Sequence, residues 1–329
     1  MRFLPTEEQD DFTRTLRSLL GAAEVPAAVR AWAAGEHGPG LALWSRLADT
    51  GLFALAVPEA YEGMGPLPVE LALGFVELGR AGVPGPAVES AAVSVLLAHL
   101  GDGALAKRFL PGLAAGTAPA TLTLPGGSPY ALDADAATWH FTVSAAGELR
   151  LAPAGSTVAP LASLDPARRL GAPADGGELL AAGPAVTAAA EAALRWARLL
   201  TAAQCLGVGE ALLGRTVEYA KQRTQFGTPI GGFQAVKHRL ADTLLGLEFA
   251  RPLLWAAALS LEPGEVAAAK LAAGGAAYAA ALTALQLHGA VGYTEELDLS
   301  LWLRKARPLR DAWGTPAQCR ERVLQSRER

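Results

Sequence analysis

The feature that most restricts the fold of this chain is a long helical pattern in its second half. Between Ala189 and Gln222, apolar residues such as Leu194, Leu200 and Leu206 recur on a broad surface at helical spacing. Alanine, the best helix former, fills much of the remainder. The pattern stops before Gly227-Thr228-Pro229, and it predicts one long helix.

Further helical segments complete this half of the chain. Phe233–Leu261 has apolar residues at helical spacing, and Pro252 is expected to kink or interrupt that helix. Glu265–Leu287 is alanine-rich and nearly featureless, as in a helix that is buried on several sides. Two shorter helices are expected near 299–309 and 316–327. Four or five helices in succession predict a C-terminal bundle over residues 185–329.

The rest of the chain divides into a helical part and a β-rich part. Residues 1–115 are interpreted as a domain of helices joined by Gly/Pro turns, with Thr6 as the first N-cap. Over residues 116–184, β-forming runs such as Thr121–Leu124 and Trp139–Val143 are separated by Gly, Pro, Asp and Ser. This pattern predicts a small β domain. The expected fold class is therefore mostly α with a small β domain.

Composition argues against several classes of protein. The net charge of -4 argues against nucleic-acid binding. Cys205 and Cys319 provide neither a disulfide framework nor a zinc cluster, and the five histidines have no metal-ligand spacing, so no metal is expected. The apolar run Ala276–Leu287 is too short to cross a membrane, and no signal peptide is recognised. We expect a cytoplasmic protein without a membrane partner.

Two segments could carry chemistry. In the first, Arg223 ends the long helix beside a glycine-opened loop, where a guanidinium and loop amides can bind a phosphate. In the second, Gln286 precedes closely spaced small residues from Gly289 to Gly292, which allow close approach to a ligand. Each segment also has an ordinary interpretation. Arg223 can be a C-terminal helix cation, and the glycines can simply stop a helix.

Taken together and in this order, the two segments resemble the acyl-CoA dehydrogenase family. Residues 223–242, RTQFGTPIGGFQAVKHRLAD, are similar to that family's R-x-Q-F-G…F-Q…K…L-A-D signature. Residues 286–294, QLHGAVGYT, are similar to its Q-x-x-G-G-x-G-Y-T motif, and residues 57–65, VPEAYEGMG, also agree. The resemblance extends over nearly the whole chain.

The resemblance implies three domains, namely an N-terminal helical domain (1–115), a reduced middle β-barrel or sheet (116–184) and a C-terminal helical bundle (185–329). Such proteins bind FAD at subunit interfaces and oxidise the Cα–Cβ bond of acyl-CoA thioesters. The expected electron acceptor is an electron-transfer flavoprotein or a similar protein.

By carry-over, nine residues are expected to contact an FAD that a neighbouring subunit mainly holds. Those on its pyrophosphate side are Arg223, Gln225 and Phe226. Those near its adenine are Ile230, Phe233 and Val236. Those at its diphosphate are Gln286, Gly289 and Ala290. Ala290 replaces a family glycine, and the methyl group is expected to be tolerated because the family contact is through the backbone.

The chain departs from the family at the catalytic base. Dehydrogenation needs a group that removes the α-proton while flavin N5 accepts the β-hydride. The family's glutamate position is occupied here by Trp313, and the alternative base position in some members aligns with Ala197. Neither side chain accepts a proton, and Asp311 is the least improbable substitute. The family's flavin-facing Thr-Glu-Pro…Gly-Ser-Asp is reduced to Thr123-Leu124-Pro125-Gly126-Gly127.

This combination resembles one chain of the heteromeric acyl-CoA dehydrogenases of actinobacteria, some of which act on steroid side chains. The hypothesis is a subunit without its own base in an α2β2 enzyme, which completes the FAD site of a homologous partner chain. Two alternatives stay open. One is a self-sufficient homomeric flavoenzyme with a displaced base or altered chemistry, and the other is a scaffold that binds no flavin.

Overall fold

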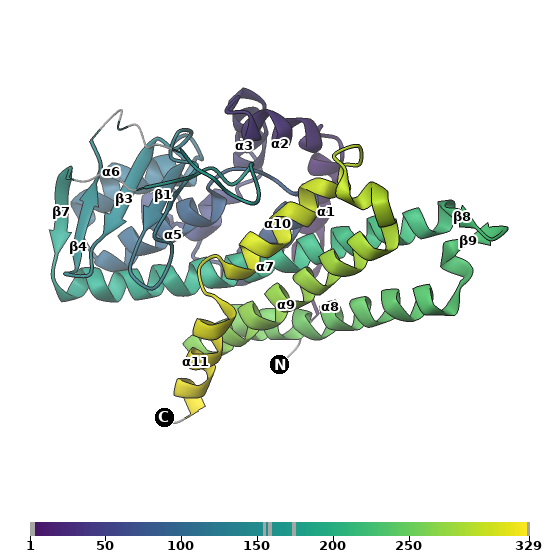
Figure 1. Cartoon of the computed structure of the whole chain (residues 1–329). Helices are drawn as coiled ribbons and strands as arrows, with labels where there is room; N and C mark the ends of the chain where they lie inside the picture. The colour runs from purple at the N-terminus through teal and green to yellow at the C-terminus, as the bar shows by residue number, and fades with distance from the viewer. Residues whose placement is uncertain (1–3, 154–155, 157–159, 173–175, 328–329) are drawn as a thin grey trace.

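The computed structural model describes residues 4–153, 156, 160–172 and 176–327. A group of short helices comes first, small sheets follow, and a bundle of long helices completes the chain (Figure 1). The predicted fold class, mostly α with a small β part, is confirmed. The core runs through all three parts, from Leu16 in the first helix to Trp313 near the end.

Among the N-terminal helices, α5 is buried along nearly its whole length and packs against α6. As predicted, Thr6 caps the first helix, because Thr6 Oγ1 accepts the Gln9 N–H while the Gln9 side chain accepts the Thr6 N–H. After Gly51 the chain forms two short 3₁₀ turns, Phe53–Ala56 and Glu59–Tyr61. The helices are α1 (Glu7–Gly21), α2 (Val25–Ala33), α3 (Gly38–Ala48), α4 (Pro68–Ala81), α5 (Ala87–Leu100) and α6 (Gly103–Ala114).

The β part contains two small sheets. The four-stranded sheet has the order β1-β3-β4-β7, and β1 is parallel to β3 with Leu122 opposite Phe141, both buried. The three-stranded sheet has the order β2-β6-β5. Both strands named from the sequence, β1 and β3, are present. The first sheet comprises β1 (Ala120–Thr123), β3 (Trp139–Val143), β4 (Glu148–Leu151) and β7 (Glu178–Ala182), and the second comprises β2 (Ala131–Leu132), β6 (Leu170–Gly171) and β5 (Pro160–Leu161).

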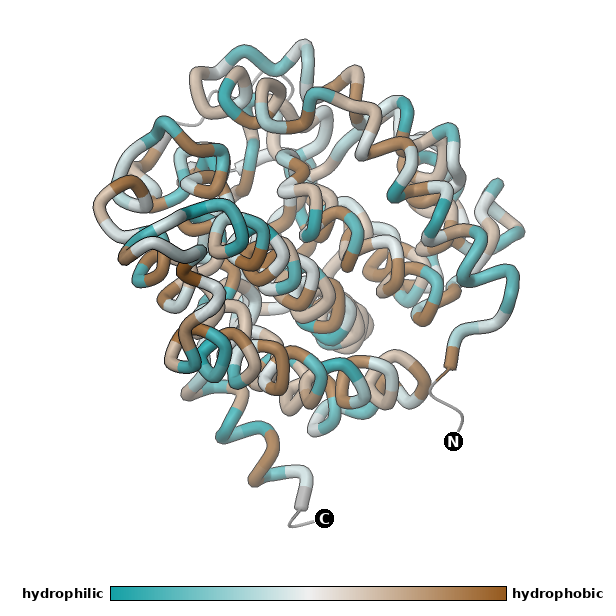
Figure 2. Tube along the Cα trace, turned by 90° about the vertical axis from the view of Figure 1, so that its right-hand side faces the viewer, coloured by the Kyte–Doolittle hydropathy of each residue, from teal (hydrophilic) through white to brown (hydrophobic). Residues whose placement is uncertain are grey.

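The helix α7 connects the sheet end of the molecule to the opposite end (Figure 1). Its 39 residues give a length of about 58 Å. Hydrophobic positions recur all round the long helices instead of on one face (Figure 2), as expected for helices packed on several sides. The bundle comprises α7 (Pro184–Gln222), α8 (Gln234–Ser260), α9 (Pro263–His288), α10 (Leu299–Asp311) and α11 (Pro316–Arg327).

Two expectations about the bundle are corrected. Pro252 does not interrupt α8, which runs without a break from Gln234 to Ser260. The argument that the apolar run near Ala276 is too short for a membrane is also wrong, since α9 with the turn after it, Pro263–Tyr293, is long and apolar enough to cross one. However, α9 packs against α7, α8, α10 and α11, and more than half of its most apolar stretch is buried inside the molecule. This is the environment of a core helix.

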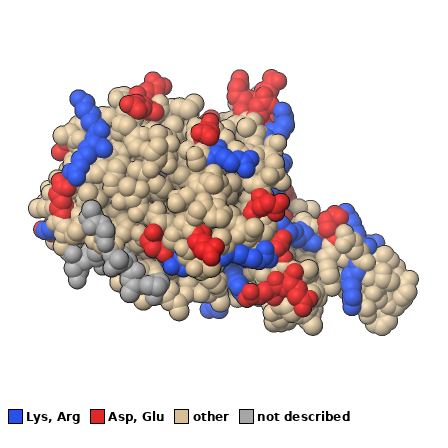
Figure 3. Space-filling view, turned by 90° about the horizontal axis from the view of Figure 1, so that it is seen from above, with Lys and Arg blue, Asp and Glu red and all other residues tan. Residues whose placement is uncertain are grey.

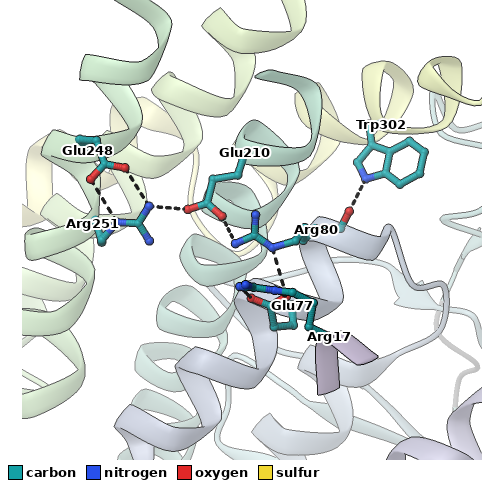
Figure 4. Close-up of polar contacts among 7 residues, drawn as sticks. All are labelled: Arg17, Glu77, Arg80, Glu210, Glu248, Arg251 and Trp302. Atoms are coloured by element: carbon teal, nitrogen blue, oxygen red, sulfur yellow. Dashed lines mark hydrogen bonds and ion pairs between the residues drawn. The ribbon is translucent and has the colours of Figure 1, made fainter. Parts of the chain in front are cut away.

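The crossing of α4 and α7 depends on two glycines. A Cβ on Gly207 would lie 1.9 Å from Val76 O, and a Cβ on Gly79 would lie 2.2 Å from Gln204 O. Only glycine therefore allows the two backbones to approach this closely. Next to this crossing, acids and arginines alternate from α1 through α4 and α7 to α8 (Figure 4). In order, these residues are Arg17, Glu77, Arg80, Glu210, Arg251 and Glu248.

Candidate functional site

The first predicted segment forms a hairpin that projects from one end of the bundle (Figure 1). β8 (Thr224–Gln225) pairs antiparallel with β9 (Thr228–Pro229). The turn residues Phe226 and Gly227 have φ of 55° and 78°, as in a type I′ turn. A phenylalanine rarely adopts positive φ, and the Phe226 ring is 93% exposed. A bulky ring on a strained, solvent-facing turn is typical of a residue that contacts another molecule.

The polar side chains of this segment are free to bind. The Arg223 N–H donates to Tyr219 O and the Arg223 carbonyl accepts the Ile230 N–H, both at 2.8 Å, so the backbone is fixed. Among the described residues, the side chains of Arg223 and Gln225 make no hydrogen bond or ion pair, and both are exposed. A planar guanidinium on a fixed backbone suits a phosphate oxygen pair.

The apolar residues predicted near an adenine lie at the base of the hairpin. Phe233 is 37% exposed and meets Phe226 edge-on at 6.2 Å between ring centroids. Ile230 and Val236 are half-buried. Seen from above, the hairpin end projects as a lobe that carries several basic side chains (Figure 3). An anionic, partly apolar ligand fits this surface better than a metal ion does.

The second segment lies at the end of α9. His288 is the last helical residue, and Gly289 follows with φ of 62° in a 3₁₀ turn, Gly289–Tyr293. Gln286, Gly289 and Ala290 are exposed. A methyl group at 290 therefore faces outward and leaves the backbone accessible.

The structure places the two segments at the same end of the bundle. The ring of Tyr219, in the last turn of α7, stacks on His288 at 4.1 Å with an interplanar angle of 23°. The Tyr219 hydroxyl donates to His288 O at 3.4 Å. Burial lowers the pKa of His288, and its hydrogen bond to Ala284 O opposes that shift. The stack thus joins Arg223, one turn after Tyr219, to the surface formed by Gln286 and Gly289.

Trp313, which the sequence resemblance predicts to stand at the glutamate position, is a buried indole. Trp313 is 2% exposed and has φ of 57°, which is a left-handed conformation for a bulky residue. Its Nε1–H donates to Glu89 Oε1 at 3.0 Å, and its carbonyl accepts from Arg198 Nε at 2.9 Å. Ala197, the alternative position, is fully buried on α7.

The segment of residues 123–127, predicted from the sequence to be a reduced flavin-facing segment, packs directly on this indole. A Cβ on Gly127 would lie 2.8 Å from Trp313 Cζ3, so no space separates them. Arg198 also reaches the neighbouring Gly126 carbonyl, at 3.5 Å. A planar ring has no slot between residue 127 and residue 313 in this arrangement.

The acids considered from the sequence lie elsewhere. Asp311, at the end of α10, is half-exposed and pairs with Arg310 at 3.0 Å. Asp242 on α8 is exposed. Glu295 and Glu296 precede α10, whose N-cap is Asp298, and Glu295 pairs with Arg304.

Sequence reasoning missed the acid closest to Trp313. Glu89 on α5 is 1% exposed, and burial raises its pKa, opposed mainly by the charge of Arg168. The available signal was a single glutamate in the otherwise apolar helix of residues 87–100. A charged residue on such a helix is rarely buried without a specific partner.

The chain matches two family models. The N-terminal domain of acyl-CoA dehydrogenase matches residues 6–117, and the C-terminal domain of acyl-CoA dehydrogenase matches residues 187–326. A relative from Mycobacterium tuberculosis, acyl-CoA dehydrogenase IpdE2, is 35% identical over 324 residues, which is 97% of each chain.

Solved structures of this family share the fold over the whole chain. A glutaryl-coenzyme A dehydrogenase in complex with glutaryl-CoA has a TM-score of 0.86 at 21% identity, covering 100% of this chain and 97% of that one. A variant of the steroid acyl-CoA dehydrogenase Tcur3481-Tcur3483 has 0.85 at 23%, covering 97% of each. A glutaryl-CoA dehydrogenase from Mycobacterium smegmatis in complex with FADH2 has 0.83 at 18%, covering 99% and 95%.

With both family models matched and a full-length relative at 35% identity, the chain belongs to the acyl-CoA dehydrogenase family.

Proposed function

We propose that this chain is a subunit of a FAD-dependent acyl-CoA dehydrogenase that completes the FAD site of a homologous partner chain and has no base of its own. The observation that carries the proposal is the buried Trp313, packed on Gly127 and bound to Glu89 where a proton acceptor and a flavin ring are needed. The domain limits 1–115, 116–184 and 185–329 belong to the same proposal.

The residues present fit one part of FAD and not another. Arg223, Gln225 and the backbone at Gly289 and Ala290 are exposed donors on a rigid surface, which suits a diphosphate that approaches from outside. The isoalloxazine ring does not fit beside Trp313, because the indole and Gly127 are already in contact. When bound, FAD accepts the hydride of the dehydrogenation, and this chain's own residues would only hold and orient its diphosphate.

The exposed apolar side chains of α8 are an argument that a partner chain binds there. They include Phe249, 72% exposed, and they form a row along the outside of the helix. Apolar surface of this extent is typical of a face that another chain covers. The row consists of Leu244, Leu245, Phe249 and Leu253. We propose a homologous acyl-CoA dehydrogenase chain as the partner, in an α2β2 arrangement, with an electron-transfer flavoprotein or similar acceptor and a cytoplasmic location.

Glu89 does not favour a self-sufficient enzyme over this proposal. Glu89 lines a cavity in which the centre of a water-sized sphere can occupy only about 20 Å³. An acyl thioester therefore has no access to the Glu89 carboxylate. Bulky or polycyclic acyl groups are the substrate class suggested by similarity to a protein described as a steroid acyl-CoA dehydrogenase.

The test is flavin retention by the co-expressed pair. Arg223→Ala removes a charge-assisted contact worth roughly 1.5–3 kcal/mol, so FAD affinity should fall about 10- to 100-fold. The matched control is Lys221→Ala, two residues away, because Lys221 is exposed and bound to Glu218 at 2.6 Å. Flavin absorbance after gel filtration measures occupancy. Equal flavin content in both variants would contradict a role of Arg223 in FAD binding.

A further inference from the structure

A narrow cavity lies beside Glu89, where the N-terminal helices, the second sheet and the bundle meet. Inside it, the centre of a water-sized sphere can occupy about 20 Å³. Five polar side chains line it, supplied by α5, the loops at β2 and before β6, α7 and α10. They are Glu89, Asp133, Arg168, Gln204 and Lys305.

Two carboxylates in this cavity each have one oxygen that is bound and one that is not. Glu89 Oε1 accepts the Trp313 indole N–H, and Asp133 Oδ1 accepts the Trp32 indole N–H and the Arg169 N–H, at 3.0–3.2 Å. Glu89 Oε2 and Asp133 Oδ2 are buried with no hydrogen-bond partner among the described residues. Both side chains are 1% exposed. Buried carboxylate oxygens are rarely left without a partner, because their desolvation is costly.

The charges around the pair do not neutralise it. Lys305 is already bound to Asp165, with Nζ and Oδ2 3.0 Å apart and both residues buried. Gln204 on α7 is uncharged, and the remaining wall from the end of α4 to the start of α5 is apolar or glycine apart from Glu89. Arg168 is therefore the cation left to balance Glu89 and Asp133. Two full negative charges beside one cation would be unfavourable in such a buried place.

We propose that this cavity is a binding site for one water molecule and one proton, shared by Glu89 and Asp133. The protonated carboxyl, at Asp133 Oδ2 or at Glu89 Oε2, donates its O–H to the water, and Arg168 donates to the same water. The water donates to the unpartnered oxygen of the other, ionised carboxylate. One water needs roughly 10–15 Å³ of such volume and two to four polar partners, and the cavity provides both. With one carboxyl protonated, the remaining negative charge is balanced by Arg168.

The proton affinities of the two acids agree with this site. Burial raises the pKa of Asp133 to about 7, while the Trp32 hydrogen bond and the charge of Arg168 oppose the shift and the charge of Glu89 adds to it. Burial also raises the pKa of Glu89. The pair thus holds a proton at a pH where an exposed carboxyl has lost its own.

The site affects how the second sheet is attached to α2 and how Trp313 is held. Asp133 directly follows β2 of the second sheet, and its bonds to the Trp32 indole and to the Arg169 N–H fasten that sheet to α2. Glu89 holds Trp313 in the position that excludes a flavin ring. Loss of the shared proton places a second negative charge between the Glu89–Trp313 contact and the Asp133–Trp32 contact. The added repulsion weakens the attachment of the second sheet to α2. This inference does not depend on whether the chain contacts FAD.

Difference infrared spectroscopy of the intact protein between about pH 5 and about pH 9 tests the proposal. The wild type should show one protonated carboxyl that disappears with a midpoint near the Asp133 pKa of about 7. In Glu89→Gln, Asp133 should titrate at a lower pH than in the wild type, because the charge of Glu89 no longer raises its pKa. In Asp133→Asn, the Glu89 carboxyl should also lose its proton at a lower pH, because its negative neighbour is gone. Asp298→Asn, which removes a partly exposed acid bound to Arg30, is the control and should leave the band unchanged.

Two results would overturn the proposal. One is the absence of a protonated carboxyl in the wild type near pH 6. The other is an unchanged midpoint for the remaining acid in both variants, which would mean that the two groups do not share a proton. If either variant fails to fold, a high-resolution crystal structure of the wild type decides. Density for a water between Glu89 Oε2 and Asp133 Oδ2 supports the site, and an empty cavity or a direct oxygen–oxygen hydrogen bond contradicts it.

Discussion

Replacement of Trp313 by alanine and by glycine separates its packing from its backbone conformation. Trp313 is buried, and truncation of a core tryptophan to alanine costs about 3–5 kcal/mol in the free energy of unfolding. The backbone at this residue has φ of 57°, which costs a residue with a Cβ roughly 1–2 kcal/mol. Glycine adopts that φ freely but gains more entropy in the unfolded chain, which costs about 0.5–1 kcal/mol.

The two terms give an unusual order of stability. Trp313→Gly should be less destabilising than Trp313→Ala by up to about 1 kcal/mol, although glycine has the smaller side chain and normally the larger cost. Trp313→Phe keeps most of the packing and removes only the donor to Glu89, so it should cost roughly 1–3 kcal/mol.

Equilibrium urea unfolding followed by circular dichroism measures all three variants on one scale. If Trp313→Gly is clearly less stable than Trp313→Ala, the positive φ is not held in the folded protein. If Trp313→Ala costs less than about 1 kcal/mol, the indole is not packed on Gly127, and the closed slot loses its support.

Three other predictions follow from the same contacts. The pKa of Asp133 rises from 3.8 to about 7 on folding. As the pH is raised, the unfolded chain therefore loses this proton first, and the free energy of unfolding falls as the pH increases from about 4 to about 7. Asp133→Asn should remove that decline, at most about 4 kcal/mol, when stability is measured against pH. Arg80→Met leaves the buried Glu77 and the partly buried Glu210 each with one arginine, and it should cost about 2–3 kcal/mol in thermal or urea unfolding. Arg14→Met, in an exposed pair, should cost under about 0.5 kcal/mol. A loss below about 1 kcal/mol for Arg80→Met would contradict a stabilising role for the alternating arginines and acids between α1 and α8. Phe226→Gly should leave the thermal stability of the chain unchanged or slightly higher, since φ of 55° suits glycine. The same change should lower flavin retention by this chain with its partner. Unchanged retention would mean that the Phe226 ring makes no contact with flavin.

Residue periodicity predicted the long helices because their signal is local. Alanine propensity and apolar spacing mark α7 within a few residues of its observed ends, and the glycine-proline stop marks the hairpin. The expected interruption at Pro252 is absent because the packing of α8 on α9 holds the helix together around a residue that removes one backbone hydrogen bond. That packing is not visible in local propensity.

The closed region around Trp313 could not be predicted from spacing. Glu89 and Trp313 are separated by 224 positions in the sequence, and Trp32 and Asp133 by 101. A buried acid in an apolar helix signals only that some partner exists. The pairing of Trp313 with Glu89 and of Trp32 with Asp133 depends on how the strands of the β part pack between α2, α5 and α10. The exposed residues of the hairpin were placed by motif alone, and their contact with FAD stays a prediction.

The flavin content of the chain alone and with its homologous partner tests the central claim most directly. The account predicts no bound FAD for the purified chain by itself. With the partner it predicts one FAD for each pair of chains, with turnover of an acyl-CoA. Stoichiometric FAD on the isolated chain together with dehydrogenase activity would contradict the account, because the ring would then have to occupy the space that Trp313 and Gly127 fill.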